Sequence, residues 1–571
     1  MSGYSETIRV PGAAARGYRP QAQGVPTAAG LLLPSFGTIV FAVTLLQVLF
    51  LAQGARTLFR DSDTGWHIRN GEAILESLSA PHTDAFSYTR SGQTWFAWEW
   101  LSDALFGAAH RVGGLAAVAV LAALTIALTV WLASRLALSL GGNLFMTAGA
   151  VVVLLGTTSL HWLARPHIFS WLLALIVLAI AEFERHSPPF KGGGAARSAD
   201  GVVSEDQNES VGFLSPPRPL HLRLLRGILL RSRPPLLGEE GNIERQRPLS
   251  HLYLVPLIAC IWANLHGSFL LAPAILFVYT VGNWLGGHPA IRFAAASLAS
   301  LAATFINPYG WRLHSHVFAY LNNDYLMDHI AEFRSYSFHT PGAIYVELFL
   351  FISVLGAAAL LKQRAFGPAL LALGLLHMSL YSARHLPTAA VLLLPLSVAA
   401  LSREAREWPK LRTFFAYSDR LQSIDARVWG VVPLMLVLVF TLAGTDGLAR
   451  AGKVGFDPSA FPVRAADFLE KQNTGRIFTK DQWGGYLIYR FNGRSKVFLD
   501  GRSDFYGQNL LETYAQVMEV KPGWNAVLTE YNVRSVLIPP DHALASVLKL
   551  SPAWKQVYGD TIAAVFERTG V

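Results

Sequence analysis

The sequence has little charge and almost no cysteine. Only 15% of its 571 residues are Asp, Glu, Lys or Arg, whereas 52% are hydrophobic. This composition excludes an ordinary soluble protein, and a mean hydropathy of +0.34 is typical of a polytopic membrane protein. The single cysteine, Cys260, lies in an apolar stretch, so the chain has no internal disulfide and cysteine usage says nothing about its compartment.

A basic face and an internal repeat are also missing. The net charge of +9 comes from Lys and Arg residues that are spread over many loops. This distribution indicates the positive-inside bias of a membrane protein and excludes a nucleic-acid partner. No pair of interrupted helices recurs at matching positions in two halves, which argues against a transporter built from inverted repeats.

Long apolar stretches dominate what is present. A membrane-spanning helix needs roughly 20 apolar residues, and about eleven stretches qualify or nearly do: 31–54, 113–138, 143–162, 166–184, 251–265, 267–286, 290–306, 341–361, 366–382, 386–402 and 428–446. The pair on either side of Gly267 could be one long helix that is broken there. We expect two spans.

When eleven helices cross the membrane in order, the loops between them fall on its two faces. Residues 1–30 resemble a disordered cytoplasmic tail, and the apolar stretch after them is too long for a cleaved signal peptide. The Gly-, Ser-, Pro- and Arg-rich insert 185–250 is also expected to be disordered. The basic connector 403–427 shares its face, so that face is predicted to be cytoplasmic. The loop 56–112 and everything after Asp446 are then periplasmic.

Residues 447–571 have the composition of a soluble domain. Short β-rich runs occur at 476–479, 486–490, 496–500, 535–539 and 563–567, and helical patterns occur at 462–471, 510–520 and 524–531. These elements predict a small α/β domain on the periplasmic surface. Within it, Asp500 and Arg502 are interpreted as a structural ion pair.

The loop 56–112 concentrates ionisable groups beside the first span. Between Arg60 and Gly71 it holds two carboxylates, an imidazole and two guanidinium groups. Each of them must be solvated or paired at a membrane surface, so the cluster favours a functional site. Apolar residues at helical spacing after Trp66, and again from Trp95 to Arg111, predict two amphipathic helices in the interface.

This arrangement resembles the GT-C superfamily of integral membrane glycosyltransferases, which includes protein mannosyltransferases and aminoarabinose transferases. The residues that carry the resemblance are Asp61-Ser62-Asp63, Trp66-His67-Ile68, Gly71, Pro81, Asp84–Thr89 and Trp95–Leu101, and the wider combination with Asn264–Gly267, Trp483–Tyr486 and Asp500–Arg502 looks like an uncharacterised bacterial branch. The resemblance implies a GT-C-like transmembrane domain over residues 31–446, with about 11 transmembrane helices, in the bacterial inner membrane. It also implies transfer of a sugar from a polyprenyl-phosphate-linked donor to an acceptor hydroxyl on the periplasmic face.

The resemblance further implies roles for particular residues. In the family an acidic residue just after the first span is the catalytic base, which here is Asp63, with Asp61 as second choice. The base takes the proton of the acceptor while cationic groups stabilise the departing phosphate, and one displacement from a single face inverts the anomeric carbon. The candidate substrate-binding residues are His67, Arg165, His167, Asn264, His266, Arg384 and His385. Guanidinium groups bind phosphate oxygens in a bidentate fork, which favours the two arginines as phosphate ligands.

This chain departs from many relatives in the second periplasmic loop, where Arg165-Pro166-His167 stands in place of an acidic residue. That difference argues against a metal site built from two loops. Asp61 and Asp63 could still bind Mg²⁺ or Mn²⁺. Relatives that use polyprenyl monophosphate donors often need no metal, so we expect none.

Simpler interpretations of the same residues stay open. Asp61 and Asp63 could cap the interfacial helix, and Asp84 is interpreted as a turn or cap residue. His266 could be a packed interfacial histidine. For the whole chain, the alternatives to an enzyme are a non-catalytic membrane scaffold and a lipid or glycan transporter. The motifs encode neither the sugar nor the unknown periplasmic acceptor.

Overall fold

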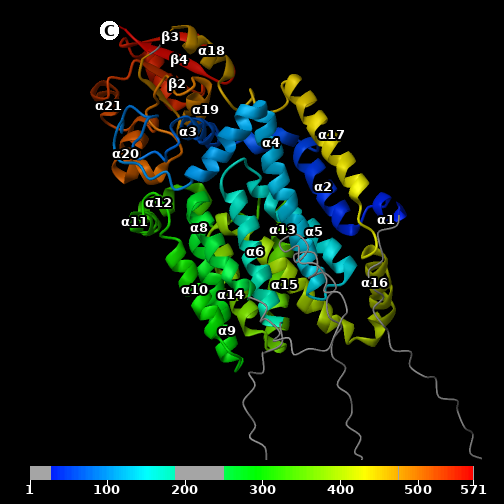
Figure 1. Cartoon of the computed structure of the whole chain (residues 1–571). Helices are drawn as coiled ribbons and strands as arrows, with labels where there is room; N and C mark the ends of the chain where they lie inside the picture. The colour runs from blue at the N-terminus through cyan, green and yellow to red at the C-terminus, as the bar shows by residue number, and fades with distance from the viewer. Residues whose placement is uncertain (1–27, 187–249, 473–474, 570–571) are drawn as a thin grey trace, which may run out of the picture.

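The computed structural model describes residues 28–186, 250–472 and 475–569. The predicted tail 1–30 and insert 185–250 lie almost wholly outside these residues. The described chain forms a helical membrane domain and, at one end of it, a smaller α/β domain of residues 463–568 that we call the C-terminal domain (Figure 1). We call the end of the membrane domain that carries it the C-domain face. The predicted fold class is confirmed.

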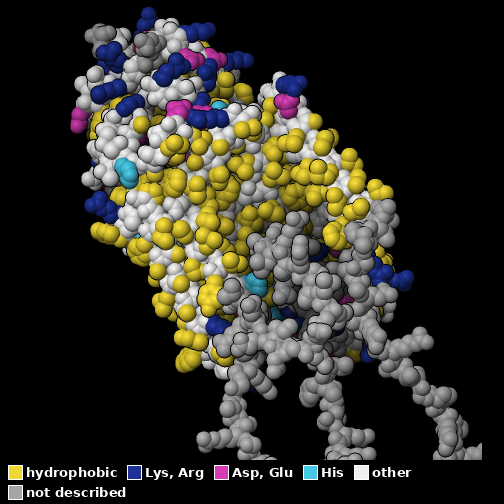
Figure 2. Space-filling model, viewed as in Figure 1, with side chains coloured by type: hydrophobic (Ala, Val, Ile, Leu, Met, Phe, Trp, Pro, Cys, Tyr) yellow, Lys and Arg dark blue, Asp and Glu magenta, His cyan; other side chains and the backbone are white. Residues whose placement is uncertain are grey.

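Apolar helices build the membrane domain at the predicted positions. Within the described residues, eight helices are long and apolar enough to cross a membrane, and three shorter apolar helices lie among them. The apolar helices are α2 (Phe36–Phe50), α4 (Trp100–Ser139), α5 (Leu144–Thr158), α6 (His167–His186), α8 (Val255–Leu265), α9 (Leu271–Leu285), α10 (Ile291–Ala303), α13 (Ala343–Lys362), α14 (Phe366–Tyr381), α15 (Leu386–Arg406) and α17 (Val431–Arg450). Figure 2 shows hydrophobic side chains covering one face of this bundle, as contact with lipid requires.

The chain is broken at Gly267 into two helices, of which the one after the break is long enough to cross a membrane and the one before it is shorter. His266 has extended backbone angles, φ −166° and ψ 148°, and it separates α8 from α9. Shorter helices lie at the ends of the bundle: α1 (Ala28–Leu32), α11 (Trp311–Leu321), α12 (Asp324–His329) and α16 (Arg412–Asp425). Of these, α11 and α12 lie next to the C-terminal domain in Figure 1.

The loop 56–112 forms the two predicted interfacial helices. The first is α3 (Asp63–Ser77). The second begins at Trp100, later than predicted, because Trp95 N–H donates to the His82 carbonyl in a short strand-like pairing. It continues into the membrane span as the 40-residue α4, and the kink at Gly113 and Gly114 divides the two parts.

Two glycines let α3 cross the start of α4 in backbone contact. A Cβ on Gly71 would collide with the Asp103 carbonyl, and one on Gly107 would collide with the backbone of Gly71. The close crossing buries His67 and Asn70 of α3 against α4.

The C-terminal domain is a four-stranded sheet with helices around it. The strands β1 (Ile477–Thr479), β2 (Ser535–Ile538), β3 (Trp554–Gly559) and β4 (Ala564–Arg568) are ordered β1-β2-β4-β3, with β1 and β2 parallel and the other pairs antiparallel. The helices are α18 (Val463–Gln472), α19 (Asp481–Arg490), α20 (Ser503–Met518), α21 (Trp524–Glu530) and α22 (Ala543–Leu550).

Three of the five predicted β-runs lie in strands, and the other two do not. The run 486–490 lies in helix α19, where Trp483 and Tyr486 to Ile488 are buried at helical spacing. The run 496–500 makes only isolated bridges, in which Val497 pairs with Ile477 and with Ser87 of the first loop. Strand β3 was not predicted. The first loop therefore extends the edge of the C-terminal sheet.

We predict that Gly71→Ala destabilises the protein, because the added methyl group forces α3 and α4 apart. Overpacking of this kind costs about 3 kcal/mol at the upper end of its usual range. The measurement is the apparent melting temperature of the detergent-solubilised chain. Gly149→Ala in α5 is the matched control, since its Cβ would have no neighbour within 4 Å. Equal melting temperatures of the two variants would contradict the close crossing of α3 and α4.

Candidate active site

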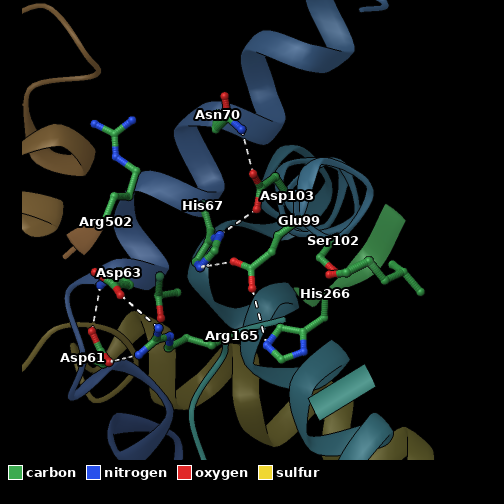
Figure 3. Close-up of polar contacts among 12 residues, drawn as sticks. Asp61, Asp63, His67, Asn70, Glu99, Ser102, Asp103, Arg165, His266 and Arg502 are labelled. Carbon is green, nitrogen blue, oxygen red and sulfur yellow. Dashed lines mark hydrogen bonds and ion pairs between the residues drawn. The ribbon is translucent and has the colours of Figure 1, made fainter. Parts of the chain in front are cut away.

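The two predicted catalytic carboxylates meet Arg165 at the start of α3. Arg165 Nη1 lies 2.7 Å from Asp61 Oδ2, and Arg165 Nη2 lies 3.1 Å from Asp63 Oδ2 (Figure 3). Asp61 also accepts the backbone N–H of Asp63 at 2.9 Å, so it has the predicted capping contact as well. The side chain of Asp61 is 25% exposed and that of Asp63 only 9%. Asp61 is therefore the more accessible of the two.

Arg165 also faces a cavity of about 90 Å³ at the C-domain face. One buried water needs roughly 10–15 Å³ by the same measure, so the cavity has room for a phosphate-sized group. Its wall comes from five separate segments: Glu99 before α4, residues 161–171 around the start of α6, the break at 266–268, Glu332 on its own, and residues 384–388 around the start of α15. Of the predicted substrate-binding residues, the cavity brings together Arg165, His167, His266, Arg384 and His385. The guanidinium groups of Arg165 and Arg384 therefore line the same cavity.

A third carboxylate, Glu332, neutralises both arginines. It lies on the 3-10 turn η5 (Ala331–Phe333), 3.5 Å from Arg165, 4.0 Å from Arg384 and 3.4 Å from His161. Burial alone would raise the pKa of Glu332, but these neighbours outweigh it and hold the pKa well below its usual range. Glu332 is therefore ionised and occupies the arginines in place of an anionic ligand.

The structure places two of the predicted substrate-binding residues outside the cavity wall. His67 is fully buried and lies behind Glu99 (Figure 3). The amide of Asn264 is used inside the fold: its oxygen accepts from Trp100 Nε1 at 2.8 Å, and its nitrogen donates to the carbonyls of Cys260 and Ile306. Asn264 therefore fixes the segment that carries His266.

Glu99, Asp103 and Glu332 were missed as site residues. Glu99 stands between Trp98 and Trp100 at the start of an apolar helix, and Asp103 follows one turn later on the same face. Two carboxylates four residues apart, on a helix that is packed on both sides, were the sequence signal that could have identified this pair. Glu332 lies in a segment without periodicity, and nothing in the sequence marks it.

The C-terminal domain covers the carboxylate cluster. A Cβ on Gly485 of α19 would collide with the Ser62 carbonyl, and one on Gly501 would collide with the carboxylate of Asp63. Burial, and next the neighbouring charge of Asp61, raise the pKa of Asp63 to about 8, while Arg165 opposes the rise. Asp63 is thus the most basic member of the cluster with Arg165.

Arg502 joins this cover to the first loop. It is buried and donates to Asp500 at 2.7 and 2.8 Å, as the predicted structural pair, and also to Asp84 of the first loop at 2.9 Å. Its guanidinium lies 4.5 Å from the centre of the Trp95 ring. Asp84 has the predicted turn role too, because it accepts the backbone N–H groups of Phe86 and Ser87.

Comparison with known proteins identifies the fold. No protein-family model and no curated protein matches the chain. The archaeal oligosaccharyltransferase AglB from Archaeoglobus fulgidus, in complex with an inhibitory peptide and a dolichol-phosphate, matches with a TM-score of 0.55 and 12% identity over 93% of this chain and 74% of AglB. The apo form of the Archaeoglobus fulgidus oligosaccharyltransferase gives 0.53 and 11% over 88% and 69%. ArnT from Cupriavidus metallidurans, bound to undecaprenyl phosphate, gives 0.45 and 14% over 94% and 97%.

The two oligosaccharyltransferase structures have the GT-C fold of membrane glycosyltransferases. At identities of 11–12%, the likeness shows the fold. This chain has the GT-C fold, with its first loop and C-terminal domain packed together at one end.

We predict that Arg502→Leu destabilises the chain by about 3–5 kcal/mol, because Asp84 and Asp500 are left buried without a counter-charge. Melting temperature is the measurement. Arg494→Ala is the control: its side chain is 74% exposed and pairs with Glu470 at 3.3 Å, so its loss costs at most about 1 kcal/mol. If Arg502→Leu and Arg494→Ala had the same melting temperature, the buried ion pair of Arg502 would not hold the domains together.

Proposed function

We propose that the chain is a glycosyltransferase that moves a sugar from a polyprenyl-phosphate donor to an acceptor hydroxyl at the C-domain face. The observation that carries the proposal is the cavity lined by Arg165, Arg384, Glu99 and Glu332 at one end of a GT-C fold. Asp61 and Asp63 do not line this cavity, but both contact Arg165. One of the structural neighbours is in complex with a dolichol-phosphate.

The phosphate of the donor binds in this cavity. Arg165 and Arg384 supply charge-assisted hydrogen bonds to its oxygens, and His167, His266 and His385 line the same space. An entering phosphate competes with Glu332 for both arginines. Because these groups are already in position, they stabilise the negative charge that develops on the phosphate as it leaves.

The carboxylate pair Asp63 and Asp61 supplies the base. Asp63 has the raised pKa that a base working near neutral pH needs, and Asp61 is the more exposed of the two. The base takes the proton of the acceptor hydroxyl as its oxygen attacks the anomeric carbon. The bond from that carbon to the phosphate oxygen breaks on the opposite side, so the anomeric configuration inverts.

The C-domain face is proposed to be periplasmic, in a bacterial inner membrane with the N-terminus in the cytoplasm. Basic residues at the other end of the bundle support this orientation, among them Lys362, Arg364, Arg403, Arg406 and Arg412. The site would then face a polyprenyl-linked donor in the outer leaflet.

The expectation that no metal is required stays a prediction. Among the residues that the structure describes, no three His, Cys, Asp or Glu side chains are grouped so that they could hold a metal ion. Asp61 and Asp63 instead contact Arg165, which gives the phosphate a fixed cationic partner.

We predict that Asp63→Asn lowers sugar transfer by about 100-fold or more, because a general base contributes roughly 10²–10⁴ to the rate. Asp61→Asn has a smaller effect. The assay follows label from a panel of polyprenyl-phosphate sugars in membranes. Asp446→Asn, an exposed change in α17, is the control and keeps the wild-type rate.

The pH dependence gives a second measurement. A base must be ionised, so the wild-type rate rises with pH toward the Asp63 pKa of about 8. The rise disappears in Asp63→Asn. Unchanged transfer in Asp63→Asn would assign the base elsewhere. A wild-type chain that binds the lipid carrier but transfers no sugar would favour a scaffold or a transporter.

A further inference from the structure

A line of buried polar groups runs behind the cavity and ends at Glu99 (Figure 3). Asp103 accepts from Asn70 Nδ2 at 2.6 Å, and its other oxygen lies 2.6 Å from His67 Nδ1. His67 Nε2 faces Glu99 Oε2 at 3.7 Å, and Glu99 Oε1 lies 3.4 Å from His266 Nε2. Only Glu99 and His266 of these five line the cavity. Glu99 therefore connects the buried groups to the substrate space.

The hydrogen-bond partners assign the tautomer of His266. His67 Nε2 is buried without a hydrogen-bond partner among the described residues. The backbone N–H of Ser268 donates to His266 Nδ1 at 3.3 Å, so His266 carries its hydrogen on Nε2 and presents it to Glu99.

Glu99 consequently has a donor beside one oxygen. Its other oxygen faces His67 Nε2 at 3.7 Å, which is too far for a hydrogen bond. In the described part of the chain, no Arg or Lys nitrogen lies within 4 Å of Glu99, whereas Asp61, Asp63 and Glu332 all contact Arg165. The surroundings of Glu99 therefore favour its neutral form.

The charges around the cavity agree with this geometry. Burial, and next the charge of Asp103, raise the pKa of Glu99 to about 8. Burial also lowers the pKa of His67 and of His266 well below the usual value, so both rings are neutral. The titratable and charged groups around Glu99 are His67 on α3, Asp103 on α4, His161, Arg165 and His167 before and at the start of α6, His266 before α9, Glu332 on η5, Arg384 and His385 before α15, and Asp504 on α20.

We propose that Glu99 is neutral in the resting protein and donates a hydrogen bond to the phosphate that leaves the anomeric carbon. This inference rests on the proposed function. The acceptor oxygen bonds to the anomeric carbon and loses its proton to Asp63. The carbon–oxygen bond to phosphate breaks, and its electron pair stays on the phosphate oxygen. Glu99 keeps its proton and donates a hydrogen bond to that oxygen, the phosphate leaves as a dianion, and Asp63 releases its proton to solvent.

A neutral acid suits an anion site better than a carboxylate does. An ionised Glu99 would repel the phosphate, but a protonated one adds a short hydrogen bond to an anionic oxygen. His67 Nε2 lies 3.7 Å from Glu99, too far to take this proton through a hydrogen bond in the described structure. The proton of Glu99 is therefore available to the phosphate.

The test is the binding of undecaprenyl monophosphate to the purified full-length chain in lipid nanodiscs at about pH 7 and about pH 9. The second pKa of a phosphomonoester is about 6, so the ligand keeps its charge over this range. Wild-type affinity is expected to fall roughly tenfold at the higher pH, as Glu99 ionises and its hydrogen bond to the phosphate is lost. Glu99→Gln is neutral at both pH values and is expected to bind equally at both.

Two matched carboxyl-to-amide changes serve as controls. Glu332→Gln lies in the same cavity and removes the anion that competes for Arg165 and Arg384, so binding tightens at both pH values and the tenfold fall persists. Asp63→Asn also keeps the fall, although its carboxyl has a pKa in the same range. The inference is overturned if the fall persists in Glu99→Gln, or if it disappears in either control.

Failure of the proposed function gives a different result. Undecaprenol, which has the same tail without the phosphate, is the reference ligand. If wild type binds undecaprenyl monophosphate no more tightly than undecaprenol at both pH values, the cavity is not a phosphate site, and both proposals fall. If the phosphate is preferred but Glu99→Gln keeps the wild-type pH dependence, only the role of Glu99 is wrong.

Discussion

The site depends on one buried guanidinium that links the two ends of the chain. Arg502 of the C-terminal domain is held between Asp500 beside it and Asp84 of the first loop, against the ring of Trp95. Two carboxylates and one guanidinium leave a net negative charge that burial makes costly, so the geometry must be well satisfied. The backbone of Gly501 then lies directly on Asp63. The environment of the proposed base is thus set by a residue that is distant in sequence.

Around the cavity, the resting protein balances its own charge. Arg165 contacts Asp61, Asp63 and Glu332. Its positive charge is therefore already paired and does not attract every small anion. A phosphate has to displace Glu332 to bind both arginines, which lowers affinity for small anions and favours a ligand with further contacts. Glu99 is the acidic group in this cluster that is not paired with a cation in the described structure, and its chemistry therefore differs from that of its neighbours.

Much of this fold follows from local sequence, and much of the site does not. The apolar stretches predicted the membrane helices because each must satisfy its own backbone in lipid. Arg165, His266 and Arg384 were found because polar groups at the ends of such helices are conspicuous. Glu99 and Asp103 were missed because they lie on the polar side of a helix that was interpreted as interfacial. No local pattern joins Asp84 to Arg502, and none shows that Gly485 of α19 packs on Ser62.

The extension of the C-terminal sheet by the first loop sets an order for biogenesis. Ser87 pairs with Val497, so a segment that leaves the ribosome early finds its partner only when synthesis is nearly complete. All the membrane helices are inserted in the interval. A nascent chain that stops after α17 would therefore be integrated in the bilayer without the cover over Asp63, and the site would be complete only when translation ends.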